Sequence, residues 1–316
     1  MPIPELTGVP VTVTGGAGFI GSHLVDALVS RGAKVTVLDD FSTGSESNLA
    51  AVRNEIRLVR GDIRSVEDCR DAVAGATFVF HEAALGSVPR SMKDPVTTID
   101  VNVRGTATAF AACREANVRR VVYASSSSVY GDSATLPKRE GEEGRPLSPY
   151  ALSKVMNEEL ADVFGRCFAM QLIGLRYFNV FGPRQSPEGP YAAVVPRFFA
   201  AVRAGRSPVI FGDGSQSRDF TYVGDVVEAN LLAAGAGAEA CGRAMNVAPG
   251  GGTTVRELAE QILVLHDSRQ PVEFAPPRPG DILHSLADST RARDLLGFQS
   301  RWEMRDGLQR LKHPDS

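Results

Sequence analysis

The segment Val11–Ser22, with the sequence VTVTGGAGFIGS, constrains the fold more than any other part of the chain. Four β-favouring residues lead into glycines at every third position: Gly15, Gly18 and Gly21. Apolar residues then recur four apart at Ile20, Leu24 and Leu28, which places them on one face of a helix. A strand, a glycine turn and a helix in this order are typical of dinucleotide sites, because the backbone at the helix start can approach a pyrophosphate. The glycine spacing alone would indicate only a turn without a ligand.

An acidic residue follows at the distance expected for such a site. Asp39 ends the second strand-like run, Lys34–Leu38. A carboxylate at this position accepts hydrogen bonds from the adenosine ribose and repels a 2′-phosphate. Asp40 adds to the repulsion, so the sequence favours NAD over NADP. The alternative is that Asp39 only ends a strand.

Strand-like runs alternate with helical segments through the first half of the chain. Further strands are predicted over 56–59, 76–80 and 121–124, and a helix from Pro95 to about residue 117. Ser65 and Asp68 resemble a capping box that opens a short helix. This alternation predicts an α/β fold built on a doubly wound parallel sheet.

The local composition of the sequence changes after about Arg176. Segments rich in proline and glycine become frequent there, and the predicted helices and strands become shorter. We therefore expect a Rossmann domain in residues 1–176, rejoined by about 219–248, and a smaller C-terminal α/β substrate-binding region in 177–218 and 249–316. Ligands of open α/β sheets bind at the carboxyl ends of the strands. The two regions should therefore face each other across a cleft at that edge.

Tyr150 and Lys154 lie four residues apart in a helix predicted from Pro149 to about residue 168, so they share one helical face. A phenol has a pKa of about 10, and action as a base near neutrality needs a shift of about three units. The Lys154 ammonium and a positively charged nicotinamide would both favour the phenolate. A hydroxyl from the run Ser125–Ser128 would share the proton with a substrate alcohol. Without the dinucleotide turn, this would be an ordinary exposed pair.

Composition argues against several other classes of function. The chain has 34 Lys and Arg against 37 Asp and Glu, with the basic residues scattered, which gives no support for nucleic acid binding. No run is long and apolar enough to span a membrane, and the N-terminal segment lacks the pattern of a signal peptide. Neither the five histidines nor the cysteines have metal-ligand spacing, so we expect no metal, reduced thiols and a cytoplasmic location. The cysteines are Cys69, Cys113, Cys167 and Cys241.

Motifs along nearly the whole chain resemble those of the extended short-chain dehydrogenase/reductase superfamily, specifically the nucleotide-sugar 4-epimerases. The matching segments are TGGAGFIGSHLV, LDDFSTG, GDIRS, HEAALGSVPRS, DVNVRGT, YASSSSVYGD, SPYALSK, GLRYFNVFGPRQ, YAAVVPRF, GDGSQSRDFTYV and RPGDILHSLAD. The SVPRS and YAAV segments are most similar to those of bacterial UDP-N-acetylglucosamine 4-epimerases. The resemblance implies a homodimer, formed through the helices that follow Pro95 and Pro149.

The implied reaction is the reversible C4 epimerisation of a UDP-hexose through a transient 4-keto sugar and tightly bound NAD. The expected substrates are UDP-N-acetylglucosamine (UDP-GlcNAc) and UDP-N-acetylgalactosamine (UDP-GalNAc). A pocket with room for these would also admit the smaller UDP-glucose and UDP-galactose.

The same resemblance assigns roles to individual residues. Tyr150 is the base, Lys154 holds the phenol and the nicotinamide ribose, and Ser126 is the hydroxyl partner. The expected cofactor-binding residues are Gly15, Gly18, Phe19, Ile20, Gly21, Asp39, Asp40, Ser42, Thr43, Asp62, Ile63, Ala83, Ala84, Tyr150, Lys154 and Tyr177. The expected substrate-binding residues are Ser87, Asn179, Gln185, Ala193, Val194, Phe211, Arg218, Arg278, Asp281 and Ser285.

Within the substrate set, Asn179, Arg218 and Arg278 are assigned to the diphosphate and Asp281 to the uridine ribose. The alternative for the two arginines is surface ion pairing. Ser285 aligns with a position at which epimerases restricted to non-acetylated sugars carry a tyrosine. A serine there leaves room for an N-acetyl group.

Two other functions stay open. A nucleotide-sugar dehydratase would reach the same 4-keto sugar and then eliminate water. Related 4,6-dehydratases carry an Asp-Glu pair where this chain has Ser127 and Ser128, which argues against that reaction. The chain could also be an inactive NAD-binding regulator, since one fold hosts many functions. The intact Tyr150, Lys154 and Ser126 argue against a loss of activity.

Overall fold

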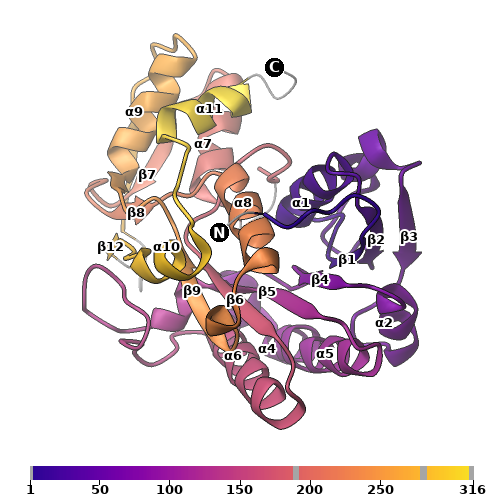
Figure 1. Ribbon diagram of the computed structural model, residues 1–316. Coiled ribbons are helices and arrows are strands. Elements are labelled where there is room, and N and C mark those ends of the chain that lie inside the picture. Colours follow the sequence, from indigo (N-terminus) through magenta and orange to yellow (C-terminus); the bar gives the residue numbers. More distant parts are fainter. Residues whose placement is uncertain (1–2, 188–191, 278–282, 313–316) are drawn as a thin grey trace.

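A seven-stranded parallel sheet forms the centre of the computed structural model, which describes residues 3–187, 192–277 and 283–312 (Figure 1). Its strands are β1 (Pro10–Thr14), β2 (Lys34–Asp39), β3 (Ile56–Arg60), β4 (Phe78–His81), β5 (Arg120–Ser126), β6 (Leu172–Tyr177) and β9 (Arg243–Val247). Their spatial order is β3-β2-β1-β4-β5-β6-β9, and every pairing is parallel. The order reverses between β1 and β4, which opens a crevice at the carboxyl ends of these strands. The predicted doubly wound α/β fold is confirmed.

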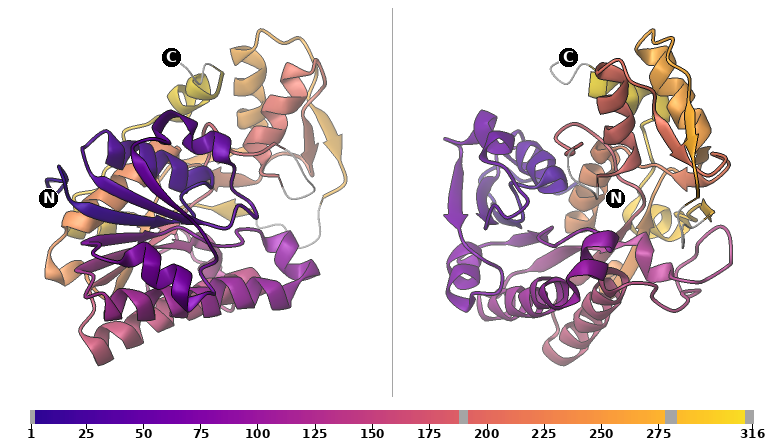
Figure 2. Two further views of the ribbon diagram at one scale, coloured as in Figure 1. Left: turned by 90° about the vertical axis from the view of Figure 1, so that its right-hand side faces the viewer. Right: turned by 180° about the vertical axis from the view of Figure 1, so that it is seen from behind.

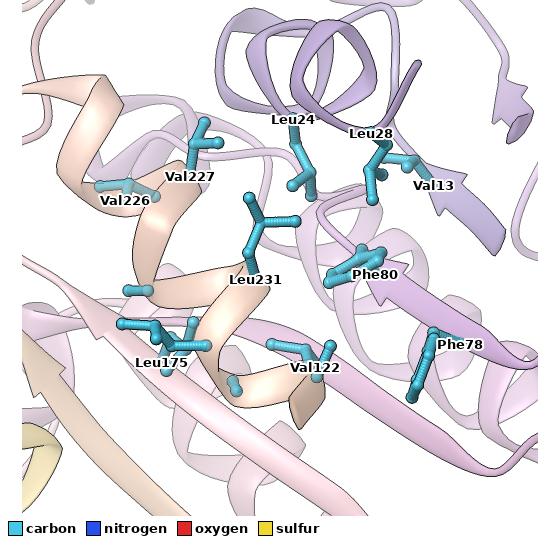
Figure 3. Close-up of a cluster of buried hydrophobic side chains, with 14 of the residues drawn as sticks. Val13, Leu24, Leu28, Phe78, Phe80, Val122, Leu175, Val226, Val227 and Leu231 are labelled. Atoms are coloured by element: carbon cyan, nitrogen blue, oxygen red, sulfur yellow. The ribbon is translucent and has the colours of Figure 1, made fainter. Parts of the chain in front are cut away.

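Helices cover both faces of this sheet, because successive strand residues point to opposite sides and both sides are apolar. One face packs against α1 (Phe19–Val29) and α8 (Val223–Gly235) (Figure 3). That cluster includes Val13, Phe80, Val122 and Leu175 from the strands and Leu24, Leu28 and Leu231 from the helices. The opposite face packs against α2 (Val66–Val73), α5 (Gly105–Glu115) and α6 (Pro149–Phe168). That second cluster includes Val79, Val121, Tyr123, Cys69, Phe110 and Ala161.

The helical region predicted from Pro95 is interrupted in the structure. After α3 (Val88–Lys93) and α4 (Pro95–Ile99), a π-helical turn over Asp100–Arg104 precedes α5. The turn directs the buried Asn102 inward, where its Oδ1 accepts from the Leu85 N–H (2.8 Å) and its Nδ2 donates to Ser153 Oγ (3.0 Å). A π-helical turn of this kind is often found at functional sites. Here it joins the loop after β4 to helix α6.

A smaller lobe built from the C-terminal half packs beside the start of α1 (Figure 2). Its elements are α7 (Val194–Arg203), β7 (Val209–Phe211), β8 (Ser217–Asp219), β10 (Gly252–Thr254), α9 (Val255–Leu265), β11 (Glu273–Ala275), β12 (His284–Ser285) and α11 (Met304–Lys312). The strands form a three-stranded sheet, β10-β8-β12, and a two-stranded sheet, β11-β7. Between the lobe's segments, α8 and β9 return to the main sheet, and α10 (Thr290–Leu296) packs beside β9.

Three short 3₁₀ helices complete the described elements: Glu46–Val52, Ser127–Tyr130 and Ala238–Ala240. In the part of the chain that the structure describes, no helix combines the length and the apolar character needed to cross a membrane.

Candidate active site

A cleft follows the carboxyl ends of the strands, where the direction of the sheet order changes. Every residue that the sequence predicts to bind the cofactor lines this cleft. The order of these residues along the cleft follows the order of the strands in the sheet. Asp62 follows β3 and Asp39 ends β2 at one end of the cleft, Gly15 follows β1 in the middle, and Tyr177 ends β6 toward the other end.

The glycine turn brings two parts of the backbone closer together than side chains would allow. Gly15 has φ +70°, and a Cβ there would lie 2.7 Å from the Cα of Ala83 at the end of β4. A Cβ on Gly21 would lie 2.1 Å from the Gly15 carbonyl oxygen, so α1 starts directly against the turn. Gly18 is the N-cap of α1 and provides no side-chain cap. The first amides of the helix can therefore donate to a pyrophosphate, which fits a dinucleotide.

The Asp39 carboxylate is anchored beside this turn. Its Oδ2 accepts from the Ala17 N–H (2.8 Å) and its Oδ1 from the Phe41 N–H (2.8 Å). Burial raises the pKa of Asp39, and these two amide hydrogen bonds oppose the increase. Each oxygen keeps lone-pair capacity for a ribose hydroxyl. The neighbouring Asp62 is engaged differently, because its Oδ1 accepts from both the N–H and the Nε of Arg64 (2.8 and 3.0 Å).

Tyr150 and Lys154 reach the cleft from the first turns of α6. The helix begins at Pro149, and Ser148 caps it by accepting from the Ala151 N–H (3.1 Å). Lys154 Nζ donates to the Ala124 carbonyl oxygen (2.9 Å) and lies 6.0 Å from the centre of the Tyr150 ring. About one turn of one helix separates the two residues and therefore fixes the distance between phenol and ammonium.

The pKa of Tyr150 is shifted in the opposite direction from the one that the sequence-based prediction required. Burial raises the pKa of Tyr150, and a hydrogen bond with the Ser126 side chain opposes the increase. Burial also lowers the pKa of Lys154 to about 8, against the attraction of Glu82 and Glu158. The protein groups alone therefore leave the phenol in its neutral form near pH 7. The positive nicotinamide is the remaining source of the predicted decrease in the pKa of Tyr150.

Ser126 is the last residue of β5 and caps the following 3₁₀ helix by accepting from the Ser128 N–H (3.2 Å). The adjacent Ser125 donates to Glu158 on α6, and Glu158 also accepts from Arg176 Nε (2.9 Å). These contacts bind the end of β5 to α6. Ser126 and Tyr150 are thereby held in fixed positions relative to each other.

Glu82 is a cleft residue that the sequence-based prediction missed. It directly follows β4, and its Oε1 accepts from the Tyr177 hydroxyl (2.8 Å). That hydroxyl oxygen accepts in turn from Asn230 Nδ2 (2.8 Å) on α8. Burial raises the pKa of Glu82 to about 7, while Tyr177 and Lys154 oppose the increase. The only signal in the sequence was a carboxylate directly after an apolar strand.

His81, the residue before Glu82, links the end of β4 to Thr14 at the end of β1 and to Thr106 on α5 through a chain of hydrogen bonds. Thr106 Oγ1 donates to the Asn102 carbonyl oxygen (2.6 Å), so it accepts from His81 Nε2 (3.0 Å). His81 Nδ1 then accepts from Thr14 Oγ1 (2.8 Å). Burial, assisted by Lys154, lowers the pKa of His81 to about 3, so the ring is neutral. The protonated nitrogen is assigned here from this network.

None of the described substrate candidates lines the cleft, but the fold brings three of them together nearby. Asn179 Nδ2 donates to the Asp219 carbonyl oxygen (3.1 Å), next to Arg218 in β8. Ser285 in β12 is the parallel partner of Arg218, so their side chains project from the same face of the small sheet. Asn179 also has φ +34°, an unusual value for a residue other than glycine.

The other described candidates lie on neighbouring elements. Ser87 caps α3 by accepting from the Arg90 N–H (3.2 Å), and the Phe211 ring lies 5.7 Å from the Arg197 guanidinium on α7. Gln185 Nε2 donates to the Val180 carbonyl oxygen (3.0 Å). Ala193 precedes α7 and Val194 is its first residue. Arg278 and Asp281 lie outside the described residues.

The parallel sheet, its uncapped glycine turn and the buried Lys154 beside the partly buried Tyr150 at the strand ends define a dinucleotide-dependent enzyme of the Rossmann class. A model of the family described as "NAD dependent epimerase/dehydratase family" matches residues 11–248, and the chain belongs to this family. The predicted family is therefore confirmed, and so is NAD as the cofactor.

Individual relatives match almost the whole chain. A UDP-glucose 4-epimerase of Mycolicibacterium smegmatis is 41% identical over 301 residues, which are 94% of this chain and 95% of that protein. A solved structure of a UDP-N-acetylglucosamine 4-epimerase from Methanobrevibacter ruminantium, in complex with UDP-N-acetylmuramic acid, is 39% identical with a TM-score of 0.91. It covers 96% of this chain and 98% of that one. A structure of the dTDP-glucose 4,6-dehydratase DesIV of Streptomyces venezuelae with NAD bound is 30% identical with a TM-score of 0.88. It covers 96% of this chain and 95% of that one.

Proposed function

We propose that this protein catalyses the reversible C4 epimerisation of a UDP-hexose. The observation that carries the proposal is that Tyr150 and Lys154 line a dinucleotide cleft and Ser126 is hydrogen-bonded to Tyr150, in a chain whose relatives include UDP-sugar 4-epimerases. Bound NAD supplies the group that accepts a hydride and returns it.

In the proposed reaction, the protein handles the proton of the C4 hydroxyl. The Tyr150 phenolate accepts that proton as C4 loses a hydride, and the carbinol becomes a ketone. Ser126 shares the proton through its hydrogen bond with Tyr150. Return of the hydride to the opposite face of C4, with the proton from Tyr150, gives the epimer without net oxidation. Lys154 supplies positive charge that favours the phenolate.

The nucleotide diphosphate is proposed to bind beside β8. Asn179 is hydrogen-bonded there to the backbone of Asp219, the residue after Arg218, and an arginine can donate two hydrogen bonds to one phosphate group. Arg278 and Asp281 are proposed to complete the contacts to the diphosphate and the uridine ribose. We also propose that 177–218 and 249–316 form the nucleotide-sugar region, with its own apolar core around Phe198, Ile210 and Leu258.

UDP-GlcNAc and UDP-GalNAc are the proposed substrates, with UDP-glucose and UDP-galactose also accepted. The support is Ser285, whose register beside Arg218 places a small side chain on the face proposed to hold the diphosphate. A serine leaves space for an N-acetyl group, and a roomy pocket does not strongly reject a smaller sugar.

A nucleotide-sugar dehydratase is the second candidate, and the similarity to DesIV is the observation that favours it. Elimination from the 4-keto sugar needs a further acid and base. Ser127 and Ser128 occupy the start of the 3₁₀ helix after β5, and hydroxyl groups are poor acids and bases near pH 7. An inactive NAD-binding regulator is the remaining alternative, and the Tyr150–Lys154 pair argues against it.

Incubation of the purified protein with UDP-GlcNAc separates these functions, because the products differ. We expect UDP-GalNAc, identified by NMR of the sugar ring. A dehydrated keto or enol-ether sugar would support the dehydratase, and unchanged UDP-GlcNAc would contradict both activities.

The variant Ser285→Tyr tests the choice of sugar. Its larger side chain should selectively lower turnover of UDP-GlcNAc and UDP-GalNAc and spare UDP-glucose, measured side by side with the wild type. Equal losses for both pairs of sugars, or a wild type that ignores acetylated sugars, would place the specificity elsewhere.

We also propose that the protein is a homodimer. An exposed apolar stripe, formed by Met92 on α3, Val96 on α4 and Leu152, Met156 and Val163 on α6, supports this proposal. The three α6 residues are spaced by four and seven, so they lie on one face of the helix. Large exposed apolar patches typically mark interfaces. The cytoplasmic location stays a prediction.

A further inference from the structure

Glu82 is a carboxylate in the cofactor cleft that the proposed chemistry does not use. It lines the cleft together with Tyr150, Lys154 and Tyr177. Among the described residues no cation forms an ion pair with Glu82, on which Lys154 acts only through space, and its side-chain hydrogen-bond partner is the neutral Tyr177 hydroxyl. When Glu82 is ionised, above its pKa of about 7, the wall of the cleft therefore holds a negative charge without a direct counter-ion.

The topology places Glu82 on the redox half of the dinucleotide site. In this fold the dinucleotide spans the point where the strand order reverses, with its adenosine ribose at the acidic residue after the second strand. Asp39 marks that end here, and the glycine turn after β1 marks the pyrophosphate. The nicotinamide half therefore lies over β4, β5 and β6. Glu82 follows β4, between the turn and Tyr177 at the end of β6.

We propose that Glu82 is an electrostatic determinant of the cofactor's oxidation state and favours NAD⁺ over NADH. Reduction adds a hydride, which is one proton and two electrons, to the nicotinamide ring and cancels its positive charge. A carboxylate in a poorly hydrated cleft stabilises the charged ring and has little effect on the neutral one. The inference rests on the cofactor placement used in the proposed function.

The positive charge of Lys154 has the opposite effect on the cofactor from the negative charge of Glu82. The Lys154 ammonium faces the same end of the cleft and interacts with Glu82 through space. By itself, this ammonium would disfavour a positive ring and favour its reduction. Glu82 offsets that charge, so the oxidised cofactor is restored at the end of each cycle. An enzyme that catalyses no net oxidation needs this balance, because a cofactor left reduced stops the next turnover.

Competition between the two cofactor forms tests this inference without any sugar substrate. The holoenzyme is equilibrated with mixtures of NAD⁺ and NADH at a pH about two units above the Glu82 pKa, so that the carboxylate is charged. Free nucleotide is removed, and the two bound forms are quantified after denaturation. Relative to the wild type, Glu82→Gln should lower the ratio of bound NAD⁺ to bound NADH about tenfold, which by linkage is a shift of about 30 mV for a two-electron couple.

Two matched variants separate charge from structure. Gln keeps an oxygen acceptor for Tyr177, so Glu82→Gln removes the charge and keeps that hydrogen bond. Glu159→Gln, at an exposed position on α6, controls for net charge and should leave the ratio unchanged. A wild-type ratio in Glu82→Gln, or a tenfold change in Glu159→Gln, would overturn the inference.

The pH dependence of the wild type gives an independent test that needs no variant to fold. The groups facing Glu82 are Tyr177 from β6, Lys154 and Tyr150 from α6, and His81 on its own strand, which is neutral. The Glu82 carboxylate is charged above its raised pKa of about 7. Lys154, with a pKa of about 8, is mostly protonated already at pH 7. A further decrease in the preference for NAD⁺ between about pH 7 and pH 6 is therefore the change expected from protonation of Glu82. A flat profile across that range would contradict the role of Glu82, whether or not the protein epimerises sugars.

Discussion

At the scale of single residues, the hydroxyl of Tyr150 decides whether the proposed proton transfer can occur. Tyr150→Phe removes that oxygen and keeps the ring and its packing. We expect turnover to fall by at least about 100-fold, the lower end of what a positioned base contributes. The bound NAD content should be unchanged. Steady-state kinetics and quantification of the released nucleotide measure the two effects, and near-normal turnover would remove Tyr150 from the mechanism.

The pH profile of the same variant gives a further check on the base. Burial raises the pKa of Tyr150 in the structure, so the phenolate fraction increases with pH throughout the range below that pKa. The wild-type kcat/KM should therefore increase with pH near neutrality. Tyr150→Phe should lose this dependence, because it has no group left to titrate at that position. A parallel slope in both proteins would mean that another group carries the proton.

At the scale of elements, the position of α1 depends on the absence of a side chain at Gly21. A methyl group there would lie 2.1 Å from the Gly15 carbonyl oxygen, so Gly21→Ala must push α1 away from β1. We expect a loss of about 1–3 kcal/mol of unfolding free energy, together with weaker NAD binding. Gly165→Ala in α6 is the matched control. Its new methyl group would meet only Met170 O at 3.6 Å, and alanine favours a helix by up to about 1 kcal/mol.

Chemical denaturation and NAD titration of the two alanine variants distinguish close packing from a general effect of glycine. If Gly21→Ala were as stable as Gly165→Ala and bound NAD normally, the contact between helix and turn would not set the phosphate site.

At the scale of the whole molecule, the exposed stripe on α3, α4 and α6 predicts how two copies associate. Val96 is 77% exposed, and a pair of charges introduced by Val96→Glu and Met156→Glu should separate the dimer into monomers. Sedimentation velocity measures the change. Val264→Glu on α9, at a residue that is 78% exposed and distant in the sequence from the stripe, should leave the dimer intact. A wild type that is monomeric at all concentrations would contradict the proposed interface.

The dinucleotide half of this protein is predictable from the amino-acid sequence, because its signals are local. The spacing of Gly15, Gly18 and Gly21, the acid at Asp39 and the four-residue interval from Tyr150 to Lys154 each depend on neighbouring residues and helical or strand period. The parallel sheet then brought the predicted cofactor residues to one edge, since the strands end at the same side.

Other features depend on contacts between segments that are distant in the sequence, and these become visible only in the folded chain. Glu82 acquires its environment from Tyr177 and Asn230, which lie far along the chain. Ser285 lies beside Arg218 because β12 pairs with β8, and two-residue strands carry no pattern that predicts a partner. The π-helical turn at Asn102 follows from hydrogen bonds to Leu85 and Ser153, which override the helical period of its own sequence. Local propensity is a property of adjacent residues, whereas burial, pairing and charge environment arise only when the chain packs against itself.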